Sequence, residues 1–289
     1  MKYRFFIFLL FFIYIIGMTA LMVWQGIGIA PDRYVFVLLL GSLLIRRTRS
    51  FLLDWIPFLF ILISYDFLRG LAPILNTNVH YWELINADEF LFGKVPSIIL
   101  QNNFFHAQQL AWYDYLATIF DFLHFALLLA FGYLLWLYHK GSFRQFVIGI
   151  SLLSYAAWAT FVIYPAAPPW MAAQKGYLPE VTKIMDSTLA AFPAAYEFPT
   201  IYHRMNPNPV AAMPSLHAAY PFLVLLFALS FFKLKGIIFL PYVLGVWISL
   251  VYLGEHYVID ILAGVIYATI FFLVARKMAK HIQWLNISD

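Results

Sequence analysis

The stretch NPVAAMPSLHAAYPFLVLL, residues 208–226, joins a polar loop to an apolar helix without a break. Prolines punctuate its first half, which carries one serine, Ser215, and one histidine, His217. The apolar run that follows continues to residue 232, so its length approaches the ~20 residues that span a bilayer. The stretch therefore predicts a membrane helix with chemically active side chains at one end.

The composition of the whole chain supports a membrane protein. Of its 289 residues, 64% are hydrophobic and 11% are charged, whereas soluble domains carry about 25% charged residues. Cysteine is absent, which excludes disulfides, thiolate chemistry and cysteine metal sites. No basic stripe accompanies the aromatic residues, so nucleic-acid binding has no support.

Eight apolar segments with ragged ends predict an all-α, polytopic membrane helical bundle. They cover about residues 5–24, 34–45, 51–69, 115–138, 144–164, 215–232, 236–253 and 257–275. The first segment is longer than the 7–15 apolar residues of a signal peptide, so we interpret it as a retained span.

The basic residues predict the orientation of these segments. With eight spans and a cytoplasmic N-terminus, 12 of the 18 Lys and Arg fall on the cytoplasmic side, as the positive-inside bias requires. These twelve are Lys2, Arg4, Arg46, Arg47, Arg49, Lys140, Arg144, Lys233, Lys235, Arg276, Lys277 and Lys280. Both termini are then cytoplasmic, and two long loops, about 70–112 and 165–213, face away from the cytoplasm.

Residues 79–112 of the first long loop mix aromatic and apolar residues with charges and amides. This pattern predicts short amphipathic helices that lie in the membrane interface, where Trp and Tyr are enriched. Two interpretations stay open, namely a connector that follows the membrane surface and a platform for a substrate.

The predicted topology places a second histidine at the same membrane face as His217. Thirty-nine residues after it, the segment GEHYVID contains His256 and Asp260. Two spans occupy the interval, and an even number of crossings returns the chain to the side that it left. His217 and His256 are therefore expected at the same, extracytoplasmic, membrane face.

His256 and Asp260 are four residues apart, so they share one face of a helix. A carboxylate there can accept a hydrogen bond from one imidazole nitrogen, which leaves the other nitrogen free to attack or to accept a proton. His217 can then serve as acid or base. The alternative is that these histidines only satisfy the interface, but a second histidine and an intramembrane acid at one face disfavour it.

PSLH followed two spans later by HYVID resembles the second and third signatures of the type 2 phosphatidic acid phosphatase superfamily. By this resemblance Ser215 binds phosphate, His217 is the general acid, His256 is the nucleophile and Asp260 orients it. The resemblance implies neither a metal nor a cofactor. It also implies a phosphohistidine intermediate, which splits one displacement into two steps.

The chain departs from the phosphatase pattern at two places. The lysine and the Arg-Pro pair of the first signature are missing, and YPAAPPW (164–170) stands there instead. Leu250 replaces the arginine of the third signature. Both departures resemble the inositol phosphorylceramide synthase branch. Further similarity to that branch lies in YDFLRG (65–70), LFGKVPSIILQ (91–101) and DFLHF (121–125).

With these family cations missing, other residues have to offset the phosphate charge. The candidates are Arg204, in the loop before PSLH, and Arg69, at the outer end of the third predicted span. Either could bind two phosphate oxygens at once. Pairing with lipid headgroups is the alternative for both.

Further residues are candidates for contact with the substrate. Asp121 and His124 lie three residues apart inside the fourth predicted span, where ionisable residues are functional candidates; they could bind substrate hydroxyls or only hold helices together. Tyr164 and Trp170 could shape the mouth of a cavity or belong to an aromatic belt. Gly264, in the last span, is expected to permit close helix packing.

These patterns predict a catalytic membrane domain (51–276) with a six-helix core, between an N-terminal transmembrane hairpin (1–50) and a short cytoplasmic tail (277–289). The predicted activity is that of a lipid phosphotransferase. It moves a headgroup phosphate, with inositol phosphate favoured, from a phospholipid donor to a lipid alcohol acceptor. A lipid phosphatase that uses the same residues with water as acceptor is the alternative.

Two alternatives come from other classes. A proton-coupled transporter would use the histidines and acids as a relay, but most of them gather at one face and no inverted repeat is evident. A serine protease built on Ser215 and His217 would leave His256 and Asp260 unexplained.

Overall fold

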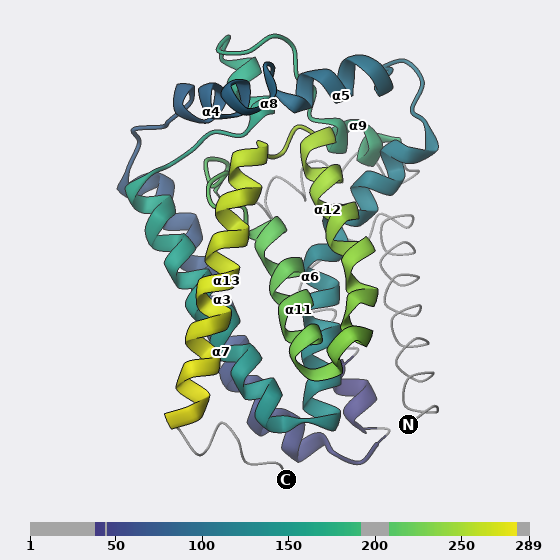
Figure 1. The fold of residues 1–289 in the computed structure, drawn as a ribbon, viewed down its shortest axis with the longest axis vertical. Coiled ribbons are helices and arrows are strands. Elements are labelled where there is room, and N and C mark those ends of the chain that lie inside the picture. The colour runs from purple at the N-terminus through teal and green to yellow at the C-terminus, as the bar shows by residue number, and fades with distance from the viewer. Residues whose placement is uncertain (1–37, 44, 192–207, 282–289) are drawn as a thin grey trace.

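The computed structural model describes residues 38–43, 45–191 and 208–281. The long helices, which stand side by side in Figure 1, are α3 (Thr48–Leu75), α6 (Trp112–Tyr138), α7 (Lys140–Ile163), α11 (Leu216–Phe232), α12 (Leu240–Tyr252) and α13 (Val258–His281). The shorter ones are α4 (Trp82–Phe92), α5 (Pro96–Phe104), α8 (Pro169–Gln174), α9 (Ile184–Ala190) and the 3-10 helix η1 (Lys233–Phe239). No strand occurs in this part of the chain, and the predicted all-α class is confirmed.

Five segments of the described chain are long and apolar enough to cross a membrane. Helix α3 shows why lipid suits the outside of the bundle. Its buried face carries Phe51 and Trp55, while Phe60 and Phe67 on another face are each 70% exposed. A helix that is apolar all round fits a bilayer better than water. The count of eight spans stays a prediction, because segment 5–24 lies outside the described residues.

One of the five segments, Leu216–Tyr252, contains two helices. As one straight helix its 37 residues would measure ~55 Å, yet η1 turns the chain so that α12 runs back beside α11 (Figure 1). Gly236 permits this turn, because a Cβ there would lie 2.5 Å from the backbone carbonyl carbon of Ala228. The segment therefore returns to its starting end, as the sequence predicts.

Helix α6 occupies the middle of the bundle. It packs against α7, α9, α11 and α12. Of its most apolar stretch 78% is buried, against 28% for α3 and for α13. Asp121 and His124 lie on this enclosed helix, where protein and not lipid surrounds them, and this lowers the cost of polar groups at membrane depth.

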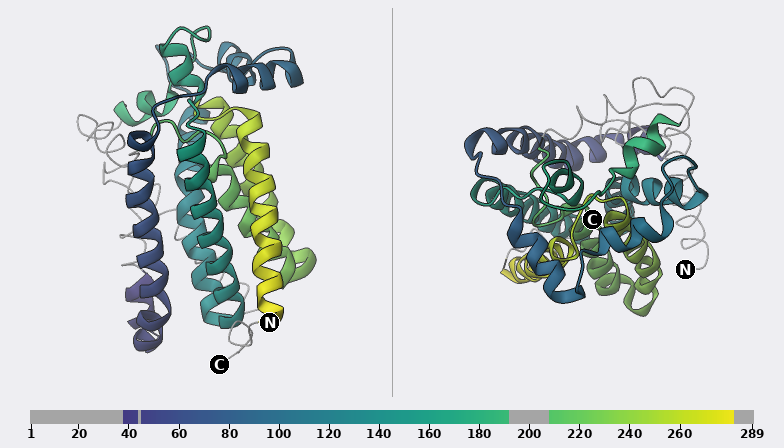
Figure 2. Two further views of the ribbon diagram at one scale, coloured as in Figure 1. Left: turned by 90° about the vertical axis from the view of Figure 1, so that its left-hand side faces the viewer. Right: turned by 90° about the horizontal axis from the view of Figure 1, so that it is seen from above.

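Short helices form a cap over one end of the bundle. Helices α4, α5, α8 and α9 lie across the end where α12 finishes and α13 begins (Figures 1 and 2). Backbone hydrogen bonds tie the connecting loops together, with Ala166 N–H donating to Val210 O at 2.9 Å and His80 N–H to Pro165 O at 2.8 Å. The short helices predicted within residues 79–112 are thus present as α4 and α5.

Candidate active site

Two histidines meet at the capped end of the bundle. His217 lies in the first turn of α11, and His256 lies in the turn that connects α12 to α13. His217 Nδ1 is 3.2 Å from His256 Nε2, and either nitrogen could be the donor of this hydrogen bond. The predicted meeting of the two residues at one end is confirmed.

Asp260 lies in the first turn of α13, fully buried, on the other side of the His256 ring. Its Oδ2 accepts a hydrogen bond from the Tyr257 N–H at 2.9 Å and lies 3.4 Å from His256 Nδ1. When Nδ1 carries the ring proton, Nε2 keeps a lone pair that faces His217. This arrangement suits a nucleophile at Nε2 with a proton donor beside it.

The backbones that carry these side chains are in direct contact. Ser215 N–H donates to Asp260 O at 3.1 Å, and a Cβ at Gly264 would lie 2.5 Å from Ser215 O. The expectation that Gly264 permits close packing is therefore confirmed. Ser215 Oγ accepts from the Ala218 N–H at 3.2 Å and caps α11, while phosphate binding by Ser215 stays a prediction.

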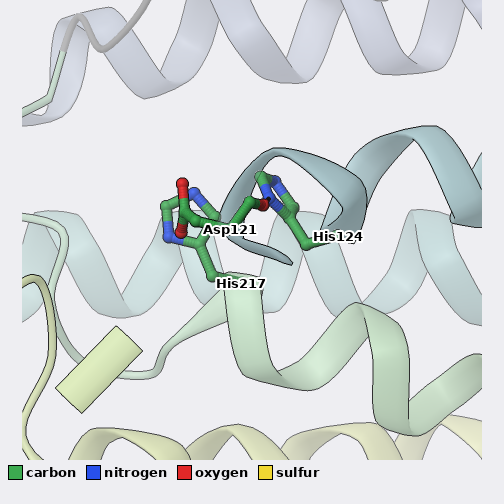
Figure 3. A group of neighbouring side chains, drawn as sticks. All are labelled: Asp121, His124 and His217. Atoms are coloured by element: carbon green, nitrogen blue, oxygen red, sulfur yellow. Dashed lines mark hydrogen bonds between the residues drawn. The ribbon is translucent and has the colours of Figure 1, made fainter. Parts of the chain in front are cut away.

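A polar group from α6 lies against His217. Asp121, His124 and His217 each offer one atom that could bind a metal ion, a carboxylate oxygen or a ring nitrogen, and these atoms lie within 4.8 Å of one another (Figure 3). His124 Nδ1 contacts the Asp121 carbonyl oxygen, and the centroids of the His124 and His217 rings are 4.1 Å apart. Asp121 Oδ1 is buried and has no hydrogen-bond partner among the described residues. The spacing would suit a metal ion, and it suits a hydroxyl group of a substrate equally well.

A cavity of about 50 Å³ opens at the two histidines. Residues from four parts of the chain line it, among them Tyr65, Arg69, Trp170, His217, Glu255 and His256. Arg69 comes from α3, where its Nη2 lies 2.8 Å from Asp66 Oδ1. The structure thus brings Arg69 and Trp170 to the histidines, and their contact with a substrate stays a prediction.

Glu255, which lines this cavity, forms a buried charged pair with Lys183, and the sequence predicted no role for either residue. Lys183 Nζ lies 3.9 Å from Glu255 Oε1, 3.7 Å from Asp186 Oδ1 and 4.7 Å from the centroid of the Trp170 ring. Burial raises the pKa of Glu255, and the Lys183 ammonium acts in the opposite direction. The position of Glu255 next to His256 is a signal that could have found it, whereas Lys183 lies in no recognisable motif.

Among the predicted substrate-binding residues that the structure describes, Ser215, Asp121, His124 and Tyr164 do not line this cavity. Tyr164 stacks on His80, with ring centroids 3.9 Å apart, and it is not among the described residues that line the cavity. Its ring packs within the cap instead, so its contact with a substrate stays a prediction without geometric support. Arg204 lies outside the described residues, and its role as a phosphate ligand also stays a prediction.

Asp88 of α4 lies at the start of α13. No pattern in the sequence predicts this contact. It is fully buried, and its two carboxylate oxygens accept hydrogen bonds from the N–H groups of Val258 and Ile259, both at 2.9 Å. The carboxylates of Asp88 and Asp260 thus both bind the N-terminal turn of α13, where unpaired amides and the helix dipole favour negative charge. The cap is thereby fastened to the helix that carries Asp260.

Comparison with known proteins identifies the family. The family model described as the PAP2 superfamily matches residues 82–274, a range that contains both histidines, Asp260 and α4. The chain belongs to the PAP2 superfamily. It is therefore an enzyme of the phosphatase and phosphotransferase type, as predicted, and the transporter and protease alternatives fall away.

Two relatives indicate which branch of the PAP2 superfamily this chain resembles. The phosphoinositol dihydroceramide synthase of Bacteroides thetaiotaomicron is 32% identical over 230 residues, which cover 75% of this chain and 74% of that protein. The inositol phosphorylceramide synthase catalytic subunit aur1 of Schizosaccharomyces pombe is 31% identical over 119 residues, 40% of this chain and 28% of that protein. These names confirm the predicted resemblance to the inositol phosphorylceramide synthase branch. No solved structure matches the chain.

Proposed function

We propose that this enzyme moves inositol phosphate from a phospholipid to a ceramide-like lipid alcohol through a phosphohistidine on His256. The observation that carries the proposal is the contact of His217, His256 and Asp260 at a cavity that Arg69 also lines. The names of the two relatives support both the phosphoinositol group and the ceramide-type acceptor.

The first half of the reaction forms the intermediate. The hydrogen bond between His217 and His256 opens, and the donor phosphate enters between the rings with its oxygens toward Arg69. His256 Nε2 forms a bond to phosphorus while the bond from phosphorus to the diacylglycerol oxygen breaks. His217 gives its proton to that departing oxygen.

The second half transfers the group to the acceptor. His217 removes the proton from the acceptor hydroxyl, whose oxygen forms a bond to phosphorus as the bond to His256 Nε2 breaks. Asp121 and His124 lie against His217, and we propose that they hold this hydroxyl. Water in the same position would make the enzyme a hydrolase: it would release inositol phosphate from phosphatidylinositol, or phosphate from a lipid phosphate monoester as a phosphatase does.

We place the active site at the extracytoplasmic face. The end of the bundle opposite the cap carries a basic cluster, Arg46, Arg47, Arg49, Lys140 and Arg144, around one surface hollow. Short loops rich in Lys and Arg mark the cytoplasmic side. Helix α13 also finishes at that end (Figure 1), which supports a cytoplasmic C-terminus.

A labelling experiment tests the proposed activity. Membranes that contain the protein receive phosphatidylinositol labelled in the phosphate, with or without ceramide. We expect label to enter a new lipid only when both the protein and ceramide are present, and we expect excess EDTA to leave the rate unchanged. Release of water-soluble inositol phosphate regardless of ceramide would establish a hydrolase and overturn the transfer. Loss of activity in EDTA would show that a metal is required, and Asp121, His124 and His217 would be the candidates to bind it.

Asp88→Asn is expected to lower kcat about 10- to 100-fold with little change in KM, since small displacements of reacting groups have effects of this size. Asparagine can accept only one of the two amide N–H groups and directs its own N–H toward the other, so the first turn of α13 shifts relative to His217. Steady-state kinetics of purified protein measure this. Glu89→Gln, at an exposed neighbour on α4, is the matched control, and equal kcat values in the two variants would refute a positioning role.

The pH dependence of kcat, compared between the wild type and Asp88→Asn, gives a second test of the role of Asp88. Burial raises the pKa of Asp88 to about 6, so below this pH one oxygen becomes a hydroxyl and the cap on α13 weakens. We therefore expect kcat of the wild type to fall as pH drops through about 6, and we expect this acid limb to be missing in Asp88→Asn. Groups that titrate in both proteins cancel in this comparison. An identical acid limb in both would contradict the assignment.

Protonation of Asp88 should raise the free energy of unfolding, although it lowers kcat. Because its pKa in the folded protein lies above the ordinary value of 3.8, the folded state binds this proton more tightly than the unfolded state does. Protonation of Asp88 therefore adds to the free energy of unfolding as pH falls from about 6 to about 4. Loss of activity at pH 5.5 would then not reflect unfolding through this group.

A further inference from the structure

We infer that Glu255, Lys183 and Trp170 form a subsite for an uncharged, hydroxyl-bearing headgroup beside the phosphate position, an inference that rests on the proposed function. Glu255 directly precedes His256, and both residues line the cavity together with Trp170. A headgroup joined to the phosphate at His256 therefore lies within reach of Glu255 and Trp170, and Lys183 lies against both of these side chains.

Glu255 is unsuited to phosphate and suited to hydroxyl groups. It is 6% exposed, and its Oε1 has no hydrogen-bond partner among the described residues. An ionised carboxylate only accepts hydrogen bonds, and it repels the anionic phosphate at short range. A buried acceptor without a donor costs free energy, and the O–H groups of a polyol supply the donors that are needed.

A carboxylate also attracts cationic headgroups, and Lys183 disfavours their binding here. Its Nζ lies 3.9 Å from Glu255 Oε1 and 4.7 Å from the centroid of the Trp170 ring. Quaternary ammonium groups are recognised by the faces of aromatic rings, and here the ring face and the carboxylate already face an ammonium group. The subsite is therefore built for a neutral polyol such as inositol and not for choline.

Two donors with different headgroups test this subsite. Purified protein receives phosphatidylinositol or phosphatidylcholine with the same acyl chains, labelled in the phosphate, and ceramide as acceptor. We expect Glu255→Gln to lower kcat/KM for phosphatidylinositol about tenfold, mainly through KM, and to lower the already low kcat/KM for phosphatidylcholine by a smaller factor. Glu180→Gln, at an exposed position between α8 and α9, is the matched control and should behave as the wild type.

Lys183→Met supplies a result that misfolding cannot imitate. Methionine keeps much of the side-chain length but removes the cation from Trp170 and Glu255. We expect the ratio of kcat/KM for phosphatidylcholine to that for phosphatidylinositol to rise at least about fivefold, because a choline group can then bind the ring and the carboxylate.

The outcomes separate this inference from the proposed function. Equal losses with both donors in Glu255→Gln would overturn the inference, because Glu255 would then act on the phosphate or on the histidines. An unchanged donor preference in Glu255→Gln and Lys183→Met would overturn it too. If the wild type transfers label from neither donor, the proposed function itself is wrong. Transfer by the wild type with an unaltered preference in the variants refutes the subsite alone.

Discussion

Replacement of His256 by alanine is expected to lower transfer at least about 10⁴-fold, to the level of membranes without the protein. His256 Nε2 lies 3.2 Å from His217, and its Nδ1 lies 3.4 Å from Asp260 Oδ2. Alanine removes the atom that forms the bond to phosphorus. Water would then have to attack an anionic phosphodiester directly, without the split into two easier steps that covalent catalysis provides.

Trapping of the intermediate gives the sharper test of His256. Wild-type protein quenched during turnover of a donor labelled in the phosphate is expected to carry label that resists alkali and is lost in acid, as a phosphorus–nitrogen bond behaves. His256→Ala should carry none. His106→Ala, at an exposed position in the cap, is the matched control and should be labelled normally. Normal turnover by His256→Ala, in a protein that melts as the wild type does, would exclude His256 as the nucleophile.

The placement of His217 and His256 at the same end of the bundle could be predicted from the sequence, because it depends on the number of spans between them and not on packing. Two apolar spans between them determine the side to which the chain returns, whatever the rotation of each helix. The placement of Asp260 one helical turn after His256 is equally local. Features of this kind depend only on the helix repeat and on the thickness of a bilayer. The spacing of residues and the length of apolar runs therefore suffice to predict them.

Asp88 and Lys183 show what could not be predicted. The hydrogen bond from Val258 to Asp88 joins residues 170 positions apart, and it exists because α4 folds over the start of α13. Lys183 reaches Glu255 from the loop between α8 and α9. No periodic pattern encodes how a cap lies on a bundle. The same reason applies to Tyr164, for which the sequence leaves a cavity mouth and an aromatic belt open, and which stacks on His80 within the cap.

Asp260→Asn is expected to lower kcat about 10²- to 10⁴-fold, with KM for the donor nearly unchanged. If the asparagine oxygen stays at the Tyr257 N–H, His256 keeps a hydrogen-bond acceptor but loses the negative charge that stabilises its cationic form. If the amide N–H₂ turns toward His256 instead, it donates to Nδ1, and the ring proton moves to Nε2, the attacking nitrogen. Both orientations slow the attack, and neither disturbs the donor contacts proposed at Arg69.

Kinetics and thermal stability together decide whether this role of Asp260 is chemical. Asp260 Oδ1 has no hydrogen-bond partner among the described residues, so an amide of the same shape fits the site without breaking a second bond. We therefore expect the melting temperature of Asp260→Asn to remain close to that of the wild type while kcat falls. A normal kcat would show that Asp260 only caps α13, as Asp88 does. His256 would then attack without a charged partner, and the pairing at 3.4 Å would serve the helix and not the reaction.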